Sequence, residues 1–208
     1  MAQTLNFDDQ KKAQELLHSI HFFAAKGWCP ATSTNHSIRL AQPDRFLISR
    51  SGVDKSLFRD TDFVVINGEG QLIDKDPTVK PSAETELHTM LYARFPEIGC
   101  VLHTHSLLGT FLSRKVAQQG YLRLEGWEIL KGLSGNLTHE MHVDIPVVSN
   151  SQQMDSIISG LENHWTNRPF GFLIAGHGLY SWGRNVPEAK RHVETLEFLF
   201  ELYQLGDK

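Results

Sequence analysis

The stretch Cys100-Val101-Leu102-His103-Thr104-His105 is predicted to form a buried strand that leads into a helix beginning near Leu107. Side chains alternate between the two faces of a strand, so His103 and His105 point to the same side, about 6.6 Å apart along the chain. Two imidazoles at this spacing can converge on one metal ion. A pair of half-exposed strand histidines is the alternative interpretation, because the motif is short.

On the N-terminal side of this strand, apolar residues from Ala13 to Ala24 recur with the helical period. Asp8 or Asp9 is expected to cap that helix, and Gly27 is expected to end it. Ser82 is expected to cap a second helix, over residues 83–95. Between the two helices, short strands are predicted at residues 37–40, 46–49, 63–66 and 71–73.

On the C-terminal side, strands are predicted at residues 145–148, 170–175 and 179–182, with a helix over residues 152–162 between the first two. A final helix is predicted over residues 187–205, where apolar positions keep the helical period. Hairpin-linked strands interleaved with helices predict an α/β fold with a largely antiparallel sheet. With no linker or repeat, residues 1–208 are expected to form a single domain.

Composition excludes several classes of function. The 208 residues contain 20 basic and 24 acidic side chains, a net charge of −4, which argues against binding to nucleic acid or to a membrane surface. No signal peptide and no membrane span is expected. Cys29 and Cys100 are too few for a disulfide scaffold, so we expect reduced thiols in a cytoplasmic protein.

A third histidine, His177, stands between Gly176 and Gly178 after an apolar strand. The glycines permit unusual backbone angles and close approach of other groups, although a histidine at a plain turn would also fit. Three histidines with an open position are typical of a catalytic zinc site, whereas structural sites are usually closed by four protein ligands. Of the other eight histidines, His88 is expected on a helix surface or in a core hydrogen bond.

Small polar loops could hold an anion. Ser82 and Glu84 stand at the expected helix start, where free N–H groups suit a phosphate, although the helix dipole alone could explain Glu84. Ser51-Gly52 follows a strand, and Asn35 ends another small polar loop. Each loop by itself has the composition of any turn.

Glu128 lies among apolar residues in Gly126-Trp127-Glu128-Ile129-Leu130-Lys131-Gly132. A carboxyl in apolar surroundings has a raised pKa and can act as a general acid or base near neutral pH. A surface glutamate beside Lys131 is the alternative interpretation.

Taken in order, these motifs resemble the class II aldolase and adducin-like family over nearly the whole chain. The resemblance rests on Asn35, Ser51-Gly52, Lys80-Pro81-Ser82-Ala83-Glu84, His103-Thr104-His105 and His177-Gly178. It implies a central, mostly antiparallel sheet with helices on both faces, and a homotetramer with active sites at subunit contacts. It also implies one Zn²⁺ per subunit on His103, His105 and His177, and a sugar-phosphate substrate held by Asn35, Ser51, Gly52 and Ser82. Glu84 falls on the acidic position that in the aldolases approaches the metal and moves protons.

Within that family, the chain is most similar to the dehydratases that remove water from a ketose phosphate. Gly27-Trp28, Ala31-Thr32-Ser33, residues 49–55 and residues 128–132 carry this finer resemblance, which gives Glu128 the acid–base role. Thr34 departs from it, standing where a glycine often precedes the asparagine, and Glu84 stands where animal relatives carry a cysteine. A sugar-phosphate aldolase or 4-epimerase is the alternative activity, and a non-catalytic adducin-like binding module is a further alternative.

Overall fold

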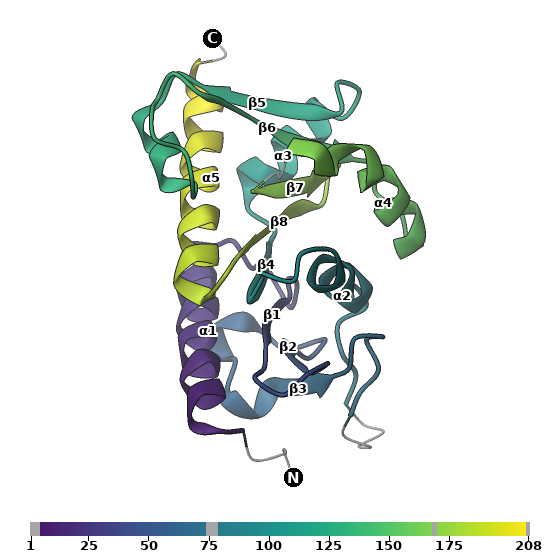
Figure 1. Ribbon diagram of the computed structural model, residues 1–208. Helices are drawn as coiled ribbons and strands as arrows, with labels where there is room; N and C mark the ends of the chain where they lie inside the picture. The colour runs from purple at the N-terminus through teal and green to yellow at the C-terminus, as the bar shows by residue number, and fades with distance from the viewer. Residues whose placement is uncertain (1–4, 74–78, 168–169, 207–208) are drawn as a thin grey trace.

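The computed structural model describes residues 5–73, 79–167 and 170–206, and its centre is one mixed sheet (Figure 1). Within these residues the sheet has eight strands in the order β3-β2-β1-β4-β8-β7-β6-β5. The strands are β1 (His36–Arg39), β2 (Phe46–Ser49), β3 (Phe63–Ile66), β4 (Cys100–Thr104), β5 (Tyr121–Glu125), β6 (His142–Val148), β7 (Gly171–Ile174) and β8 (Gly178–Gly183). The α-helices are α1 (Phe7–Ala25), α2 (Thr85–Arg94), α3 (Leu107–Lys115), α4 (Met154–Leu161) and α5 (Val186–Gly206).

Strand β4, which carries the first histidine motif, lies inside the sheet between β1 and β8. Its pairing with both neighbours is antiparallel, and His103 stands opposite Tyr180 of β8. Among the neighbouring pairs described, only β6 and β7 run parallel. The predicted mostly antiparallel sheet is therefore confirmed.

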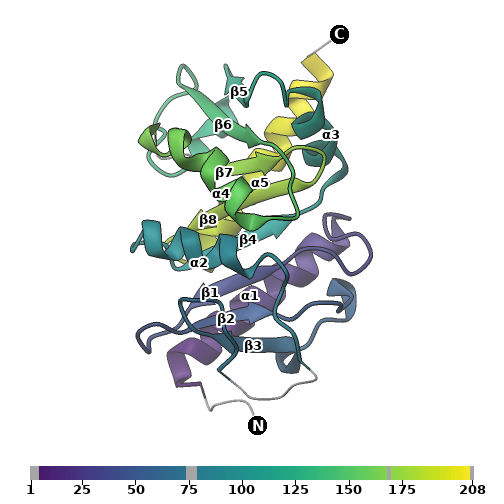
Figure 2. The same cartoon turned by 90° about the vertical axis from the view of Figure 1, so that its right-hand side faces the viewer.

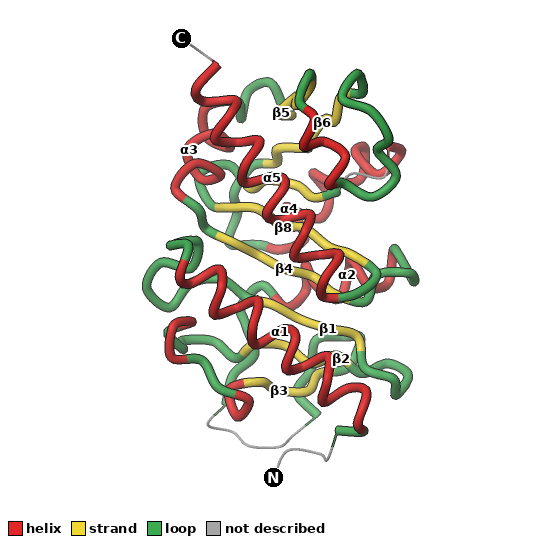
Figure 3. Tube along the Cα trace, turned by 90° about the vertical axis from the view of Figure 1, so that its left-hand side faces the viewer, coloured by secondary structure: helices red, strands yellow, loops and turns green. Residues whose placement is uncertain are grey.

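Helices cover both faces of the sheet, as the family resemblance implied. The long helices α1 and α5 lie against one face, and α2 and α4 against the other (Figures 1 and 2). Figure 3 shows α3 on the same side as α5. Buried apolar side chains fill both layers: Ile48, Leu87 and Ile157 belong to the core under α2 and α4, and Leu16, Leu102 and Val193 to the core under α1. No helix within the described residues is long and apolar enough to span a bilayer.

Several element boundaries differ from the sequence-based expectation. Asn6, not Asp8 or Asp9, caps α1, because its side chain accepts the N–H of Asp9. Helix α2 begins at Thr85, and Ser82 instead accepts the N–H of Glu84 just before it. Residues 71–73 form no strand, since Leu72 makes only an isolated bridge to Ile66.

Strand β5 was not among the strands predicted from the sequence. Its side chains alternate between buried Leu122 and Leu124 and exposed Arg123 and Glu125, a period of two that predicts a half-buried strand. That signal was present in the sequence. The strand matters because it carries the chain toward Glu128.

Candidate metal centre

The structure brings His103, His105 and His177 together at one edge of the sheet. His103 lies near the end of β4, His105 follows that strand, and His177 lies in the turn between β7 and β8. Because β8 pairs with β4, this turn reaches the end of β4. One ligand atom from each imidazole lies within 4.8 Å of the others, so the three side chains can share one ion.

Glycine is required in the turn that carries His177. Gly176 has a φ of +67°, in the left-handed region that favours glycine. At Gly178, a Cβ would collide with the backbone oxygen of Thr104 and with the ring of His105. The two glycines therefore let the His177 turn approach the end of β4 closely enough to form the cluster.

Burial and hydrogen bonding prepare these histidines as metal ligands. His103 Nδ1 donates to the carbonyl oxygen of Leu179 at 2.9 Å, which leaves Nε2 with its lone pair toward the cluster. Burial lowers the pKa of His103 well below its ordinary value. Burial and the neighbouring His177 lower the pKa of His105 to about 4. Both imidazoles are therefore neutral at neutral pH, the form that binds metal.

The donor set fits a divalent metal ion. His103 Nε2 and His105 Nε2 lie only 2.7 Å apart, so both nitrogens face the same point of the cluster. His177 Nδ1 is buried and has no hydrogen-bond partner among the described residues. Three nitrogen donors beside an open cavity are the ligand set of catalytic sites rather than of closed structural ones.

Glu84 completes the cluster from the loop before α2. Its Oε1 lies 3.0 Å from His177 Nε2, and its Oε2 lies 3.4 Å from His103 Nε2. Burial alone would raise its pKa, but His103, His177 and a hydrogen bond from Asn35 together hold the pKa well below the ordinary value. Glu84 is therefore ionised at neutral pH and can accept a proton.

Tyr180 is a site residue that the sequence analysis missed. Its hydroxyl donates to Glu84 Oε2 at 2.9 Å, and its ring stacks on His103 with centroids 4.0 Å apart. Burial and the neighbouring Glu84 raise the pKa of Tyr180, so the hydroxyl keeps its proton. Only the register of β4 against β8 reveals this contact, which is why no sequence pattern indicated it.

The cluster opens into a cavity of about 800 Å³ that also holds most of the predicted anion-binding residues. Asn35, Ser51 and Ser82 line it together with Glu84. The backbone N–H of Ser51 donates to the carbonyl oxygen of Lys80, and this bond joins the Ser51-Gly52 loop to the loop that carries Ser82. Gly52, next to Ser51, has a φ of +77° and turns its loop, but it does not line the cavity.

The loop before Asn35 turns sharply without the glycine that often stands there. Thr34 itself adopts a φ of +71°, a conformation that is costly for a β-branched residue. The side chain of Asn35 is buried and donates to Glu84 Oε2 at 2.7 Å. That amide is therefore committed to the carboxylate, and the anion-binding capacity of this loop lies in its backbone and hydroxyl groups.

Glu128 lies on the surface beside Lys131, which is the alternative interpretation, and not in apolar surroundings. Its side chain is 68% exposed and contacts Lys131 and His139. A hydrogen bond from Lys131 lowers the pKa of Glu128 instead of raising it. Exposure leaves the carboxylate solvated, so its pKa follows the nearby cation.

Within one chain, Glu128 does not share the cavity of the histidines. Glu125, at the end of β5, pairs with His142 at the start of β6, whereas Asn150 lines the histidine cavity after the end of β6. A strand of seven residues separates these two positions, roughly 20 Å at the usual rise. Glu128 therefore lies toward the opposite edge of the sheet.

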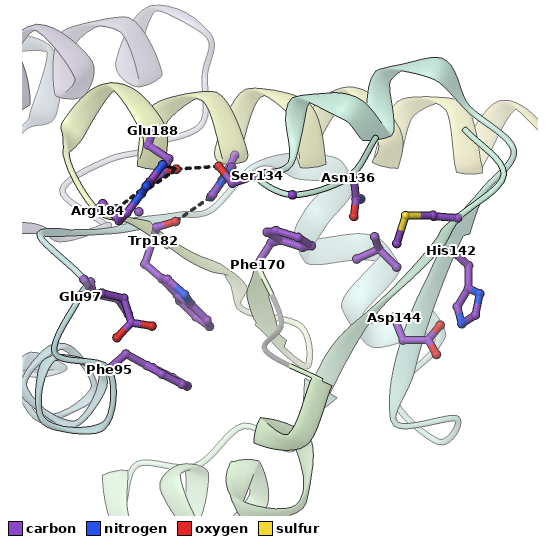
Figure 4. Close-up of a pocket in the computed structure, with 16 residues that line it drawn as sticks. Phe95, Glu97, Ser134, Asn136, His142, Asp144, Phe170, Trp182, Arg184 and Glu188 are labelled. Atoms are coloured by element: carbon purple, nitrogen blue, oxygen red, sulfur yellow. Dashed lines mark hydrogen bonds and ion pairs between the residues drawn. The ribbon is translucent and has the colours of Figure 1, made fainter. Parts of the chain in front are cut away.

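A second cavity, of about 690 Å³, lies at that opposite edge (Figure 4). Beside it, the segment after Glu128 is fastened to α5. Ser134 donates to Glu188 Oε1 at 2.6 Å, and its backbone N–H donates to His192 Nε2 at 3.1 Å. Arg184 in turn pairs with Glu188 (Figure 4). These contacts give the Glu128 segment a fixed place on the molecule.

The family model and the similar sequences match nearly the same part of this chain. The family model for the Class II Aldolase and Adducin N-terminal domain matches residues 14–204. A methylthioribulose-1-phosphate dehydratase from Stenotrophomonas maltophilia (strain K279a) is 48% identical over 190 residues, which cover 90% of this chain and 87% of the relative. The protein of the same name from Xanthomonas campestris pv. campestris (strain 8004) is 49% identical over 188 residues, covering 90% and 85%.

Solved structures share the fold at lower identity. An L-fuculose 1-phosphate aldolase superposes with a TM-score of 0.76 at 19% identity, covering 99% of this chain and 88% of that one. The l-fuculose-1-phosphate aldolase from Thermus thermophilus gives a TM-score of 0.72 at 22% identity, covering 93% of each chain. At these identities the likeness establishes the fold alone.

Proposed function

The chain belongs to the class II aldolase and adducin family, and on that premise we propose that it dehydrates 5-methylthioribulose 1-phosphate, a step of methionine salvage. The reaction removes the C3 proton and the C4 hydroxyl as water, and the resulting enol becomes 2,3-diketo-5-methylthiopentyl 1-phosphate. The observation that carries the proposal is the cluster of three histidines beside ionised Glu84, in a cavity lined by small polar loops. This arrangement can hold a metal, accept a proton and receive a phosphate.

We assign the metal as zinc, one ion per subunit, held by His103, His105 and His177. When bound, zinc supplies Lewis acidity toward the oxygens of the substrate. The chain itself supplies the proton transfers. Glu84, ionised and fixed by Asn35 and Tyr180, is placed to accept or relay a proton beside the metal.

We assign the phosphate to the loops of Ser51, Gly52 and Ser82 and to the loop that precedes Asn35. The hydroxyls of Ser51 and Ser82 line the same cavity as the histidines and can donate to a phosphate there. The described cysteines Cys29 and Cys100 are buried and free, which suits a reducing compartment, and we place the protein in the cytoplasm.

We propose that Glu128 acts as the general acid–base in the metal site of a neighbouring subunit, within a homotetramer. Two features support this: Glu128 lies at the opposite edge of the sheet from its own histidines, and apolar side chains are exposed at both places. Trp127 and Ile129 flank Glu128 with 42% and 39% of their surface exposed, and Leu107, which lines the histidine cavity, is 84% exposed. A heterologous contact between these surfaces, repeated around a ring, buries both.

Subunit mixing tests this assignment. Glu128→Gln and His177→Ala should each be inactive alone. In a tetramer reassembled from equal amounts, about a quarter of the sites combine intact histidines with a neighbour's Glu128, so activity should return to about a quarter of the parent value. A mixture that stays inactive, with mixed tetramers verified by native mass spectrometry, would show that Glu128 does not act across the contact.

A substrate panel separates the proposed activity from its closest alternative. The protein should convert 5-methylthioribulose 1-phosphate to a product lighter by one water, and leave L-fuculose 1-phosphate uncleaved. Cleavage of the second substrate into two fragments, with no dehydration of the first, would make the protein an aldolase. Purified protein with no bound metal and no turnover of either substrate would support a binding module instead.

A further inference from the structure

A continuous chain of buried hydrogen bonds runs from Glu84 into the core. Asn35 Nδ2 donates to Glu84 Oε2, and Asn35 Oδ1 bonds His88 Nε2. His88 Nδ1 bonds the hydroxyl of Ser37 at 2.7 Å, which in turn bonds the hydroxyl of Tyr92 at 2.8 Å. Asn35, His88, Ser37 and Tyr92 are all nearly or fully inaccessible to solvent.

The direction of every bond in this chain follows from its end. A carboxylate only accepts, so the Asn35 amide group must donate to Glu84 and the Asn35 oxygen must accept from His88. His88 therefore carries its proton on Nε2, its Nδ1 accepts from Ser37, and Ser37 accepts from Tyr92. Each donor points toward Glu84, and bonds aligned in this way polarise and strengthen one another.

His88 also differs from a histidine that only satisfies the core. His192, a buried histidine of α5, bonds the backbone oxygen of Trp182 through Nδ1, and its Nε2 contacts both the backbone N–H and the hydroxyl of Ser134. The ring nitrogens of His88 instead bond two side chains, one of which touches the metal-site carboxylate. Its bonding therefore serves Asn35 and not the backbone around it.

We propose that His88 is a positioning residue for the dehydration: acting through Asn35, it fixes the carboxylate of Glu84 beside the metal ligands. This inference rests on the proposed function. With Oε2 held by Asn35 and Tyr180, Oε1 is left facing His177 and the cavity. Without the His88 N–H, the Asn35 oxygen keeps only the longer contact of 3.5 Å from the Tyr180 hydroxyl, and the amide is freer to turn away from Glu84.

Two variants of similar size test the hydrogen bonds of the two His88 ring nitrogens separately. Glutamine places an N–H donor about where Nε2 stands, so His88→Gln keeps the bond to Asn35. Asparagine places its polar group about where Nδ1 stands, so His88→Asn keeps only the bond to Ser37. We expect kcat to fall about 10–100-fold in His88→Asn with KM within about twofold and metal content unchanged, because a misplaced group loses orientation and not binding.

His88→Gln should recover most of that loss. The control is His21→Gln, at a histidine of α1 whose ring bonds the backbone oxygen of Phe58 away from the histidine cavity, and it should keep the parent kcat. Equal kcat in the glutamine and asparagine variants, or losses of kcat that only follow the melting temperature, would overturn the proposal.

A measurement on the parent protein makes the inference independent of turnover. A ¹⁵N NMR spectrum of the ring nitrogens should show His88 as the neutral Nε2–H tautomer at pH 7. An Nδ1–H tautomer would reverse the chain and contradict the proposal, whether or not the protein dehydrates its substrate. A parent protein that shows the expected tautomer but turns over no methylthioribulose phosphate would contradict only the proposed function.

Discussion

At the level of single residues, His177 is the proposed metal ligand that lies outside the His103–His105 motif. It reaches the cluster through the turn between Gly176 and Gly178, and its side chain is 18% exposed. His177→Ala should remove most bound zinc and nearly all turnover while the melting temperature of the metal-free protein stays within a few degrees.

The control for this change is His142→Ala, which alters an exposed histidine beside the other cavity. Metal analysis after dialysis distinguishes the two variants. Full zinc occupancy in His177→Ala would remove this histidine from the ligand set.

The candidate metal ligands and Glu84 could be predicted from the sequence, but the residues that hold them in place could not. His103, His105 and His177 stand out by spacing and by flanking glycines, and Glu84 by its place in a motif. Tyr180 and His88 could not be found in this way, because their roles depend on strand register and on helix packing across the sheet. For Glu128, the apolar residues next to it in the sequence suggested burial, but Trp127 and Ile129 are themselves exposed.

At the scale of elements, α5 supports the metal-binding strand from the other face of the sheet. Glu197 of α5 is buried and accepts a hydrogen bond from Thr104, the residue between His103 and His105, at 3.1 Å. Burial raises the pKa of Glu197 to about 7, although the hydroxyls of Ser106 and Thr104 partly oppose this. The folded protein therefore favours the protonated carboxyl, and stability is lost as the pH rises from about 4.5 toward 7.

Glu197→Gln should remove that loss, because an amide oxygen still accepts from Thr104 and carries no charge to bury. The free energy of unfolding at pH 8 should rise by about 2–3 kcal/mol over the parent, with little change at pH 4. Urea titrations at the two pH values measure this difference. If Glu197→Gln lowers the free energy of unfolding equally at pH 4 and at pH 8, then burying the ionised Glu197 carboxylate does not destabilise the folded protein.

Elements with a strong helical period were predicted well, and short polar ones were not. The final helix was expected over residues 187–205 and is observed as Val186–Gly206. The start of α2 was placed too early because Ser82 makes its hydrogen bond one turn ahead of the helix, with Glu84 at the capping position. That displacement matters for function, since it turns Glu84 toward the histidines.

At the scale of the whole molecule, buried neutral histidines make the fold sensitive to acid. Burial lowers the pKa of His88 to about 3 and that of His36 well below its ordinary value. The unfolded chain binds protons near pH 6.5, whereas the folded protein cannot, so stability is present above that pH and is lost below it. Each such histidine should cost about 1.4 kcal/mol per pH unit below 6.5.

This loss can be measured by urea unfolding between pH 7 and pH 5. In His88→Gln, which cannot titrate, the slope of stability against pH should fall by about one proton relative to the parent. An unchanged slope would mean that His88 does not remain neutral in the fold.

The molecule as a whole carries its metal cluster at one edge of the sheet and Glu128 toward the other. This separation makes function a property of the assembly under our proposal, since a lone subunit has a metal site without its acid–base partner. Under this proposal, one subunit supplies the three histidines and Glu84 of each site, and the neighbouring subunit supplies Glu128.

Metal removal followed by zinc reloading shows whether the three-histidine site performs a dehydration. Protein stripped of metal and then reloaded with zinc is incubated with 5-methylthioribulose 1-phosphate, and the product is followed by mass spectrometry. We expect the stripped protein to leave the substrate unchanged and, after one equivalent of zinc per subunit, to form a product lighter than the substrate by one water. Water loss at the same rate in the metal-free protein, or carbon–carbon cleavage after reloading, would contradict it.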